Sequence, residues 1–299
     1  MKKTLIGLLV SILMLSNMNL VFAEESYTDN LVYEYPTAEY LATLDTMEEK
    51  YEATNVPSEI LENLTDEELI SVVLNYPYLP NIYVYDNVES GIAVLRNYFN
   101  GVGELEKRKD NIEFLYSEKL GIRERAVNEI LAGSRRNSRA VLASYTTVYT
   151  PNGTGVTVEV SPGNELSSSQ ITEFANYLAT YYSTATLLRS ATSNYNCHSY
   201  AWYSTSANNM YWMSYATAYM TDGSYSQRAK WGSIYAGDKV YYDVGDDSHS
   251  GIVYNNSSLN SNNVWVTSKW GAGGLVRHKL ADCPYLVGSN YSYISFWYR

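Results

Sequence analysis

The sequence predicts an α+β protein with a helical N-terminal segment and a strand-rich C-terminal domain. Apolar residues recur at helical spacing before residue 140, as in Leu69, Val72 and Tyr76. Beyond residue 140 the pattern changes to alternating apolar and polar residues, interrupted by glycine-bearing turns. All six tryptophans lie in this second part. We therefore expect a helical segment over 24–140 and an α+β domain over 141–299.

The first 23 residues have the features of a secretory signal peptide. Lys2 and Lys3 precede an apolar run, and Val21-Phe22-Ala23 provides a small-x-small cleavage site. The apolar run is shorter than a membrane-spanning helix requires. We expect residues 1–23 to be removed and the mature protein to be secreted, extracellular and not integral to a membrane, with the cell wall as a place of association.

The two parts differ in net charge, and the charge pattern argues against a nucleic-acid partner. The net charge is −11, and nearly all of it lies in residues 24–140. No cluster of basic residues provides the footprint of a nucleic-acid-binding protein. We expect no nucleic-acid partner.

The helical segment contains several start and stop signals. Thr65-Asp66-Glu67-Glu68 is a capping box, and Pro77 ends the helix that follows it. A second helix is expected from near Asp86 to the glycines at 101 and 103. A charged third helix over 105–116 and a fourth over 122–131 complete the segment.

A polar, basic stretch over 134–139 is typical of an exposed linker between the two parts. One hypothesis is that residues 24–140 are a pro-region or chaperone, released by proteolysis near Arg136 or Arg139. The alternative is an ordinary surface loop within one protein.

The C-terminal domain begins with a hairpin and continues with mixed elements. Residues 141–150 and 156–160 flank a turn that contains Gly153 and Gly155. A helix follows, capped by Ser168 or Ser169. We then expect a helix from Cys197 to Ser204 and strands over 237–242, 248–254 and 264–268.

Cys197 is a candidate nucleophile because it is expected in the first turn of a helix. There the helix dipole and unpaired backbone N–H groups favour the thiolate and lower the thiol pKa. A cysteine nucleophile also needs a base close in space. His198 is a poor candidate, because adjacent helical residues point about 100° apart. His249, on a strand beside Gly251, is the better candidate.

These pieces together resemble the secreted papain-like cell-wall hydrolases of the CHAP and NlpC type. The resemblance rests on Cys197 at a helix start, Gly237-Asp238 opening a strand, and His249-Ser250-Gly251-Ile252-Val253 on the next strand. It covers about residues 165–285. It implies a cysteine-bearing helix packed on an antiparallel sheet, in a papain-like domain.

The resemblance also implies an activity. Cys197 would attack an amide carbonyl, with His249 as base, in a peptide or amide bond of peptidoglycan or of a cell-surface peptide. Asn196-Cys197-His198-Ser199 departs from the family's usual context, and the third catalytic position is not a clear His, Asn or Glu. Ser268 is the candidate for that position, and His278 is the alternative. No cofactor is implied.

Other functions remain open from the sequence. Cys197 and Cys283 could form a disulfide in an exported protein, which would leave a non-catalytic module that binds glycan or protein through its many aromatic residues. Zinc held by Cys197 and the histidines matches no familiar ligand spacing. Three aspartates, Asp243, Asp246 and Asp247, lack the order of a calcium loop and are expected to be turn residues.

Overall fold

The computed structural model describes residues 32–112, 115, 121–132, 144–161, 166–244, 248–259, 263–286 and 291–299. Residues Met1–Glu34 form one unit and Tyr35–Arg299 form a second, compact unit. The predicted signal peptide, the linker over 134–139, Asp246 and Asp247 lie outside the described residues. No helix in the described part of the chain is both long and apolar enough to cross a bilayer.

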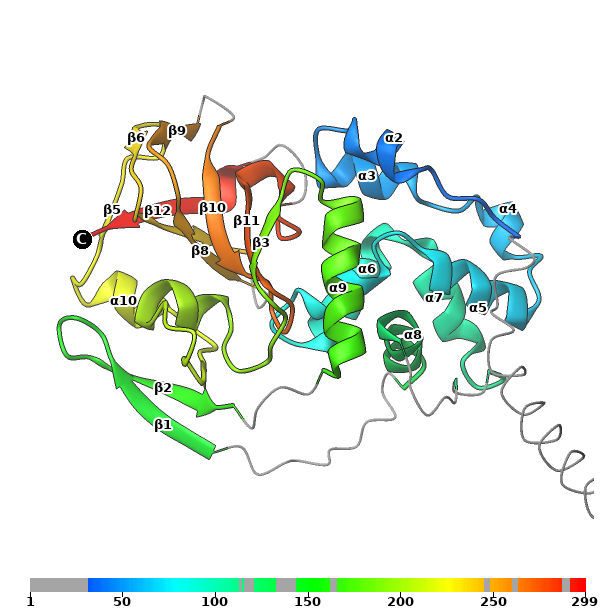
Figure 1. The fold of residues 1–299 in the computed structure, drawn as a ribbon, viewed down its shortest axis with the longest axis horizontal. Coiled ribbons are helices and arrows are strands. Elements are labelled where there is room, and N and C mark those ends of the chain that lie inside the picture. Colours follow the sequence, from blue (N-terminus) through cyan, green and yellow to red (C-terminus); the bar gives the residue numbers. More distant parts are fainter. Residues whose placement is uncertain are drawn as a thin grey trace, which may run out of the picture. The chain divides into compact units, whose positions relative to one another are not determined.

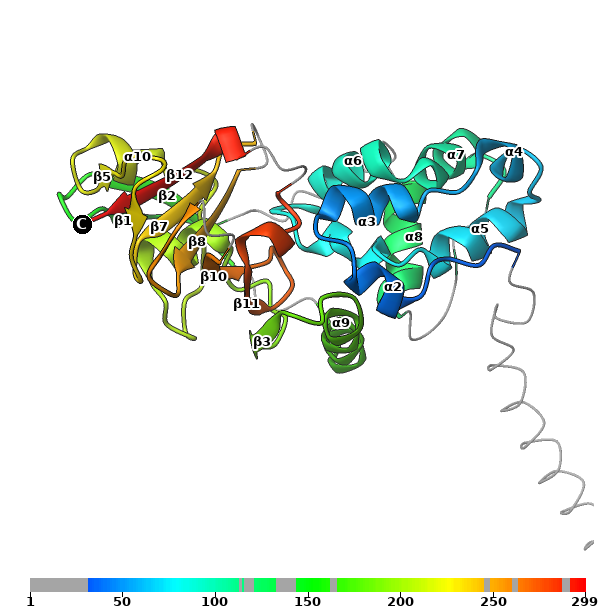
Figure 2. The same cartoon turned by 90° about the horizontal axis from the view of Figure 1, so that it is seen from above.

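The described residues before 133 are helical. Figure 1 shows these helices gathered together, and Figure 2 shows the same group from above. They are α2 (Ala38–Ala42), α3 (Met47–Ala53), α4 (Ser58–Leu61), α5 (Asp66–Asn75), the 3-10 helix η1 (Leu79–Tyr83), α6 (Val88–Tyr98), α7 (Asn100–Arg108) and α8 (Ile122–Ala132).

Local signals placed several helix ends correctly, within one or two residues. The capping box at Thr65 is confirmed, since its hydroxyl accepts the backbone N–H of Glu68 while the Glu68 carboxylate accepts the N–H of Thr65. Helix α6 begins at Val88, near Asp86 as expected, and the side chain of Asn87 caps it. The expected charged helix over 105–116 was placed too late, because α7 already begins at Asn100.

The described residues after 143 carry all the strands that the structure shows. They are β1 (Ser144–Tyr149), β2 (Gly155–Val160), β3 (Thr186–Arg189), β4 (Tyr211–Trp212), β5 (Ser226–Gln227), β6 (Ser233–Ile234), β7 (Lys239–Tyr242), β8 (His249–Val253), β9 (Ser257–Ser258), β10 (Trp265–Lys269), β11 (Leu275–Lys279) and β12 (Ile294–Tyr298). Helices α9 (Ser168–Tyr181) and α10 (Thr217–Thr221), a π-helical turn η3 (Ser199–Tyr203) and the 3-10 turns η6 (Leu280–Asp282) and η7 (Tyr291–Tyr293) lie among them.

A seven-stranded antiparallel sheet organises this part, in the order β3-β11-β10-β8-β7-β12-β5. The hairpin β1-β2 pairs with β4 in a separate sheet. The N-cap of helix α9 is Ser167, one residue before the expected caps Ser168 and Ser169, and it forms a capping box with Gln170. The structure is therefore α+β, with helices in the N-terminal part and antiparallel sheets in the C-terminal part, as the sequence predicts.

The register of the large sheet decides which face each side chain occupies. His249 is paired with Tyr242, and Gly251 is paired with both Val240 and Ser268. Since paired residues point to the same side and successive residues alternate, His249, Gly251 and Ser268 share one face. Ser250 and Ile252 occupy the other face, against which η3 packs through Trp202 and Tyr200.

Gly251 serves packing within the sheet rather than the approach of a ligand. A Cβ at this position would lie 2.4 Å from Cγ1 of Val266 and 3.2 Å from both Cβ of Ser268 and Cγ1 of Val240. The space beside His249 is thus already filled by side chains of the neighbouring strands.

Buried polar contacts join the N-terminal helices to the sheet part within the Tyr35–Arg299 unit. The Tyr85 hydroxyl donates to the carbonyl of Pro284 (3.0 Å), and the Tyr285 hydroxyl donates to the carbonyl of Val84 (3.2 Å). The side chain of Asn81 bonds to hydroxyls on both parts. These contacts hold η1 and the residues after it against the sheet part.

Candidate functional site

Cys197 lies in the first helical turn before η3, as the sequence predicts. The side-chain oxygen of Asn196 accepts the backbone N–H of Ser199 (3.1 Å), which is an N-cap hydrogen bond. The same oxygen accepts the backbone N–H of Met213 (3.1 Å), and Nδ2 of Asn196 donates to the carbonyl of Met213 (2.8 Å). Asn196 thereby holds the start of this helix, and the cysteine on it, in one position.

The thiol of Cys197 contacts a carboxylate from the N-terminal helical part. Its Sγ lies 3.6 Å from Oδ1 of Asp86 and donates to it, while Nδ2 of Asn196 lies 3.4 Å from Oδ2 of the same residue. Asp86 precedes α6 and is separated from Cys197 by 111 positions in the chain. No local pattern marks Asp86 as a site residue, so it could not be identified from the sequence.

His198 completes a three-residue cluster that we call the Cys197 cluster: Asp86, Cys197 and His198. One ligand atom from each of the three lies within 4.8 Å of the other two. The ring nitrogens of His198 also bond to the hydroxyls of Ser250 (2.7 Å) and Ser248 (3.2 Å). His198 therefore lies close to both Cys197 and Asp86, although its ring nitrogens bond to serines.

The environment of Cys197 favours the protonated thiol. Burial raises the thiol pKa well above its ordinary value, and the negative charge of Asp86 raises it further. The expected lowering by the helix start is thus outweighed. In this conformation Cys197 is a neutral, fully buried thiol.

A buried amino group lies near the cluster. Lys269, at the end of β10, donates through Nζ to the carbonyls of Thr192 (2.7 Å) and Gly273 (2.7 Å). Burial lowers its pKa to about 7, against the opposing influence of Cys197 and Asp86. Lys269 follows Ser268 in the chain and points to the opposite face of the sheet, so the register makes it a neighbour of the cluster.

The structure does not bring His249 to Cys197. The His249 ring stacks on Tyr285 with centroids 4.1 Å apart, and neither of its ring nitrogens has a hydrogen-bond partner. It also points to the sheet face opposite Ser250, which holds His198. Burial lowers the pKa of His249 well below its ordinary value. The role of base expected for His249 has no geometric support here.

Ser268 does not orient His249 either. Its hydroxyl accepts from Nε1 of Trp270 (3.1 Å) and bonds to Nε2 of His278 (2.8 Å), while Nδ1 of His278 donates to the carbonyl of Lys279 (2.8 Å). This chain of hydrogen bonds satisfies each polar atom and assigns the Nδ1–H tautomer to His278. The two residues expected at the third catalytic position therefore bond to each other, in a buried structural network.

The disulfide expected in the alternative function is absent. Cys197 and Cys283 are both free and buried thiols. Burial raises the pKa of Cys283 to about 12. Asp243, the described member of the three loop aspartates, follows β7 and donates its backbone N–H to the carbonyl of Tyr293, and the turn expected after it lies outside the described residues.

Asp86 connects the cluster to a cleft of about 480 Å³. The cleft lies between the Tyr83–Val88 stretch and β4, and its walls carry the aromatic rings of Trp212 and Tyr215 and the carboxylate of Glu159. Asp86 is half-buried and Cys197 is fully buried. The carboxylate of Asp86 thus lies between the thiol and the cleft, which we call the Trp212 cleft.

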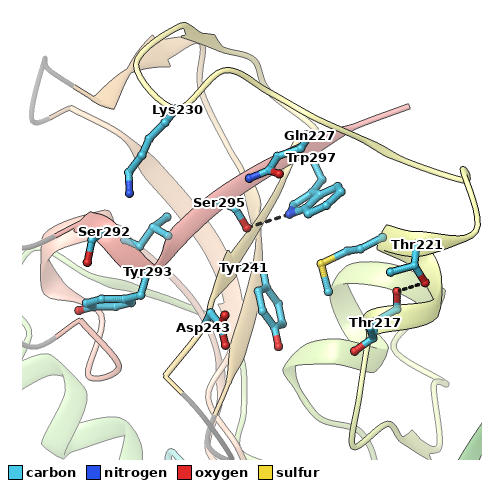
Figure 3. Close-up of a pocket in the computed structure, with 12 residues that line it drawn as sticks. Thr217, Thr221, Gln227, Lys230, Tyr241, Asp243, Ser292, Tyr293, Ser295 and Trp297 are labelled. Atoms are coloured by element: carbon cyan, nitrogen blue, oxygen red, sulfur yellow. Dashed lines mark hydrogen bonds between the residues drawn. The ribbon is translucent and has the colours of Figure 1, made fainter.

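A second cleft, of about 540 Å³, is lined in part by Tyr241. Its lining includes Tyr241, Asp243, Lys230, Gln227 and Trp297, which Figure 3 shows as sticks. The Tyr241 ring stacks on His198 with centroids 5.9 Å apart. This cleft therefore approaches the Cys197 cluster through one aromatic side chain and offers polar and aromatic contacts of its own.

Comparison with known proteins provides no further assignment. No known family model, curated protein or solved structure matches the chain. A function must therefore be inferred from the chemistry of the Cys197 cluster and its clefts.

The three buried histidines should make the stability of the protein depend on pH. Burial lowers the pKa of His198 and His278 to about 4 and lowers that of His249 well below its ordinary value. Below pH 6.5 the unfolded chain takes up protons that the folded protein does not, so stability falls as the pH falls. We expect a loss of about 2 kcal/mol from each of His198 and His278 between pH 7 and pH 5, and a further loss from His249.

Urea denaturation at the two pH values measures this loss, and His249→Phe serves as the reference variant. Phenylalanine keeps the stacking on Tyr285 and removes one titrating ring, so the loss of stability should be smaller in this variant. An unfolding free energy that is equal at pH 7 and pH 5 would refute the buried neutral state of these rings.

Proposed function

We propose that the protein is an exported thiol hydrolase that cleaves amide bonds, with Cys197 as nucleophile and peptidoglycan as substrate. The proposal includes a papain-like arrangement of the C-terminal domain, of the CHAP and NlpC type. The observation that carries it is the contact between Cys197, in the first turn of a helix, and a carboxylate that lines an aromatic cleft.

The cluster contains the groups that acyl transfer needs. Asp86 accepts the thiol proton as Sγ of Cys197 bonds to the amide carbonyl carbon, and the C–N bond then breaks as Asp86 returns the proton to the departing amine. Water hydrolyses the resulting thioester and regenerates the thiol. In this scheme Asp86 takes the role of base that the sequence suggested for His249.

Two features stabilise the charge that develops during this reaction. The backbone N–H of Cys197 is one of the donors at a helix start that lack a partner within the helix, so it suits an oxyanion. Lys269, whose pKa burial lowers to about 7, contributes the positive charge of its protonated form near the sulfur and the carboxylate. Because the resting thiol is neutral, the reaction depends on proton transfer to Asp86 rather than on a preformed thiolate.

The Trp212 cleft suits a substrate made of sugars and short peptides. Flat aromatic rings such as those of Trp212 and Tyr215 stack on sugar rings and on apolar parts of peptides. Asp86 must rotate to open the buried sulfur to this cleft. One carboxylate oxygen of Asp86 must stay within hydrogen-bond reach of Sγ after this rotation, so that it still accepts the thiol proton.

Incubation of the mature protein with purified peptidoglycan tests the proposal, with new amino groups as the measurement. We expect Cys197→Ala to lower the rate at least about 1000-fold, because no other group can form the thioester. Asp86→Asn removes the base and should lower the rate at least about 100-fold.

His249→Phe is the matched control, since its ring lies away from the sulfur. We expect its rate to stay within about threefold of the wild type. Wild-type turnover by Cys197→Ala would refute the thiol mechanism. Loss of turnover by a folded His249→Phe variant would return the role of base to His249.

A second candidate function is binding without catalysis, and the cleft in Figure 3 favours it. Trp297, Tyr241, Lys230 and Asp243 offer the mixture of aromatic and polar groups that glycan or peptide ligands require. Sedimentation with peptidoglycan and no release of amino groups would support this function over hydrolysis. Binding of this kind would not involve a disulfide, since both thiols are free.

A further inference from the structure

The Cys197 cluster also has the composition of a metal site. It combines a carboxylate, a thiol and an imidazole, each with one donor atom within 4.8 Å of the other two. We propose that Asp86, Cys197 and His198 bind one Zn²⁺ ion. The ligands come from the residues before α6 and from the start of the η3 helix, so only the folded chain assembles them.

The distance between two of the donors fits a tetrahedral ion. Zinc binds sulfur at about 2.3 Å and carboxylate oxygen at about 2.1 Å, which places the two ligand atoms about 3.6 Å apart at a tetrahedral angle. Sγ of Cys197 and Oδ1 of Asp86 are 3.6 Å apart. Calcium and magnesium prefer all-oxygen sites, whereas a mixed sulfur, nitrogen and oxygen set favours zinc.

The surroundings provide the second layer of bonds that metal ligands usually have. When zinc binds, one ring nitrogen of His198 replaces its hydrogen bond to a serine with a bond to the ion. The other nitrogen keeps its hydrogen bond to a serine hydroxyl, which fixes the orientation of the ring. Nε1 of Trp202 donates to the Ser250 hydroxyl (2.8 Å) and holds it in place. Nδ2 of Asn196 approaches the second oxygen of Asp86.

The ion has a route to the site and a place for a fourth ligand. Asp86 lines the Trp212 cleft, so an ion in that cleft meets the carboxylate first. The fourth ligand is water from the cleft, since the three protein donors leave one position of a four-coordinate ion. Binding converts the Cys197 thiol to a zinc-bound thiolate and releases one proton to solvent.

Zinc binding has a consequence for the proposed reaction. A sulfur bound to zinc, beside a carboxylate bound to the same ion, can neither attack a carbonyl nor lose a proton to Asp86. Zinc is therefore a reversible inhibitor of the hydrolase, and this consequence alone rests on the proposed function. Zinc binding itself does not depend on catalysis.

Titration of metal-free mature protein with Zn²⁺, in competition with a chromophoric chelator, tests the site. We expect one equivalent to bind with a Kd below about 1 μM. Cys197→Ala and Asp86→Asn should each weaken binding at least about 100-fold. Cys283→Ala removes the other cysteine, which lies outside the cluster, and should bind as the wild type does.

Thermal unfolding with and without Zn²⁺ gives a second readout in the same variants. A ligand that binds only the folded state raises Tm, so the wild type and Cys283→Ala should gain stability and Asp86→Asn should not. No bound equivalent, or equal binding by all four proteins, would overturn the site. Zinc binding by a protein that releases no amino groups would refute the hydrolase and leave the site intact.

Discussion

Asn81→Ala is expected to lower the free energy of unfolding by about 4 kcal/mol. Asn81 lies in η1, is 1% exposed, and bonds to three tyrosine hydroxyls. Its Nδ2 donates to Tyr51 (3.0 Å) and Tyr182 (2.9 Å), and its Oδ1 accepts from Tyr177 (2.6 Å). Each buried hydroxyl left without a partner costs about 1–3 kcal/mol, and the tyrosines can bond to one another only in part.

The effect should be this large because Asn81 joins the two parts of the chain. Tyr51 belongs to α3, whereas Tyr177 belongs to α9 and Tyr182 follows it. Figure 1 shows α9 standing between β3 and the N-terminal helices, in keeping with its contacts to both. Loss of the amide removes the polar centre of that junction.

Urea denaturation at pH 7 measures the change, with Asn176→Ala as the control. Asn176 is a residue of α9 next to Tyr177 and lies outside the buried core. Because alanine favours a helix, replacement of Asn176 should alter the free energy of unfolding by less than about 0.5 kcal/mol. A loss below about 1 kcal/mol for Asn81→Ala would show that the hydroxyls find other partners.

Gly271→Ala is expected to lower the free energy of unfolding by at least about 3 kcal/mol. Gly271 has a φ of +45°, and a Cβ there would lie 2.1 Å from the carbonyl oxygen of Tyr85 and 2.7 Å from the carbonyl carbon of Val84. Both are backbone atoms, so a change of rotamer cannot relieve the contact. The stretch that ends in Asp86 must move.

The displacement of residues 83–85 in the Gly271→Ala variant should also affect function. The backbone of residues 83–85 leads directly to Asp86, so a shift there should separate the carboxylate from Cys197. Gly271→Ala should therefore weaken zinc binding and slow hydrolysis even at temperatures where the variant stays folded. The chelator titration and the amino-group release assay measure these two effects.

The Gly237→Ala variant is the control, because it introduces backbone strain without a steric contact. Gly237 also has a positive φ, +94°, but a Cβ there meets nothing within 4 Å. Its replacement should cost about 1–2 kcal/mol from backbone strain alone. If Gly271→Ala costs no more than Gly237→Ala, the packing of Gly271 against residues 83–85 is refuted.

Elements whose signals are local could be predicted from the sequence. The capping box at Thr65, the hairpin around Gly153, and the strands that contain Tyr242, His249 and Val266 depend on neighbouring residues along the chain. Hydrogen bonds within one turn or one hairpin need no distant partner. Local signals also placed Cys197 in a first helical turn, where the structure has it.

The partners of Cys197 could not be predicted in this way. Asp86 is far from it in the chain, and only the packing of the N-terminal helices against the sheet brings the carboxylate to the sulfur. The sequence interval around Asp86 shows a helix start and nothing more. The raised thiol pKa has the same origin, because burial and a nearby negative charge together outweigh the helix dipole.

Local patterns were sufficient to predict the α+β class, the change from helices to strands near residue 140, and the helical position of Cys197. These features could be predicted because short-range hydrogen bonding and side-chain periodicity depend on neighbours in the chain. Packing between distant elements selected the residues that share the site. Strand register turned His249 toward Tyr285 and away from the face that holds His198, and the docking of the helices supplied Asp86. Contacts of this kind depend on the close packing of the whole chain, and no local pattern encodes them.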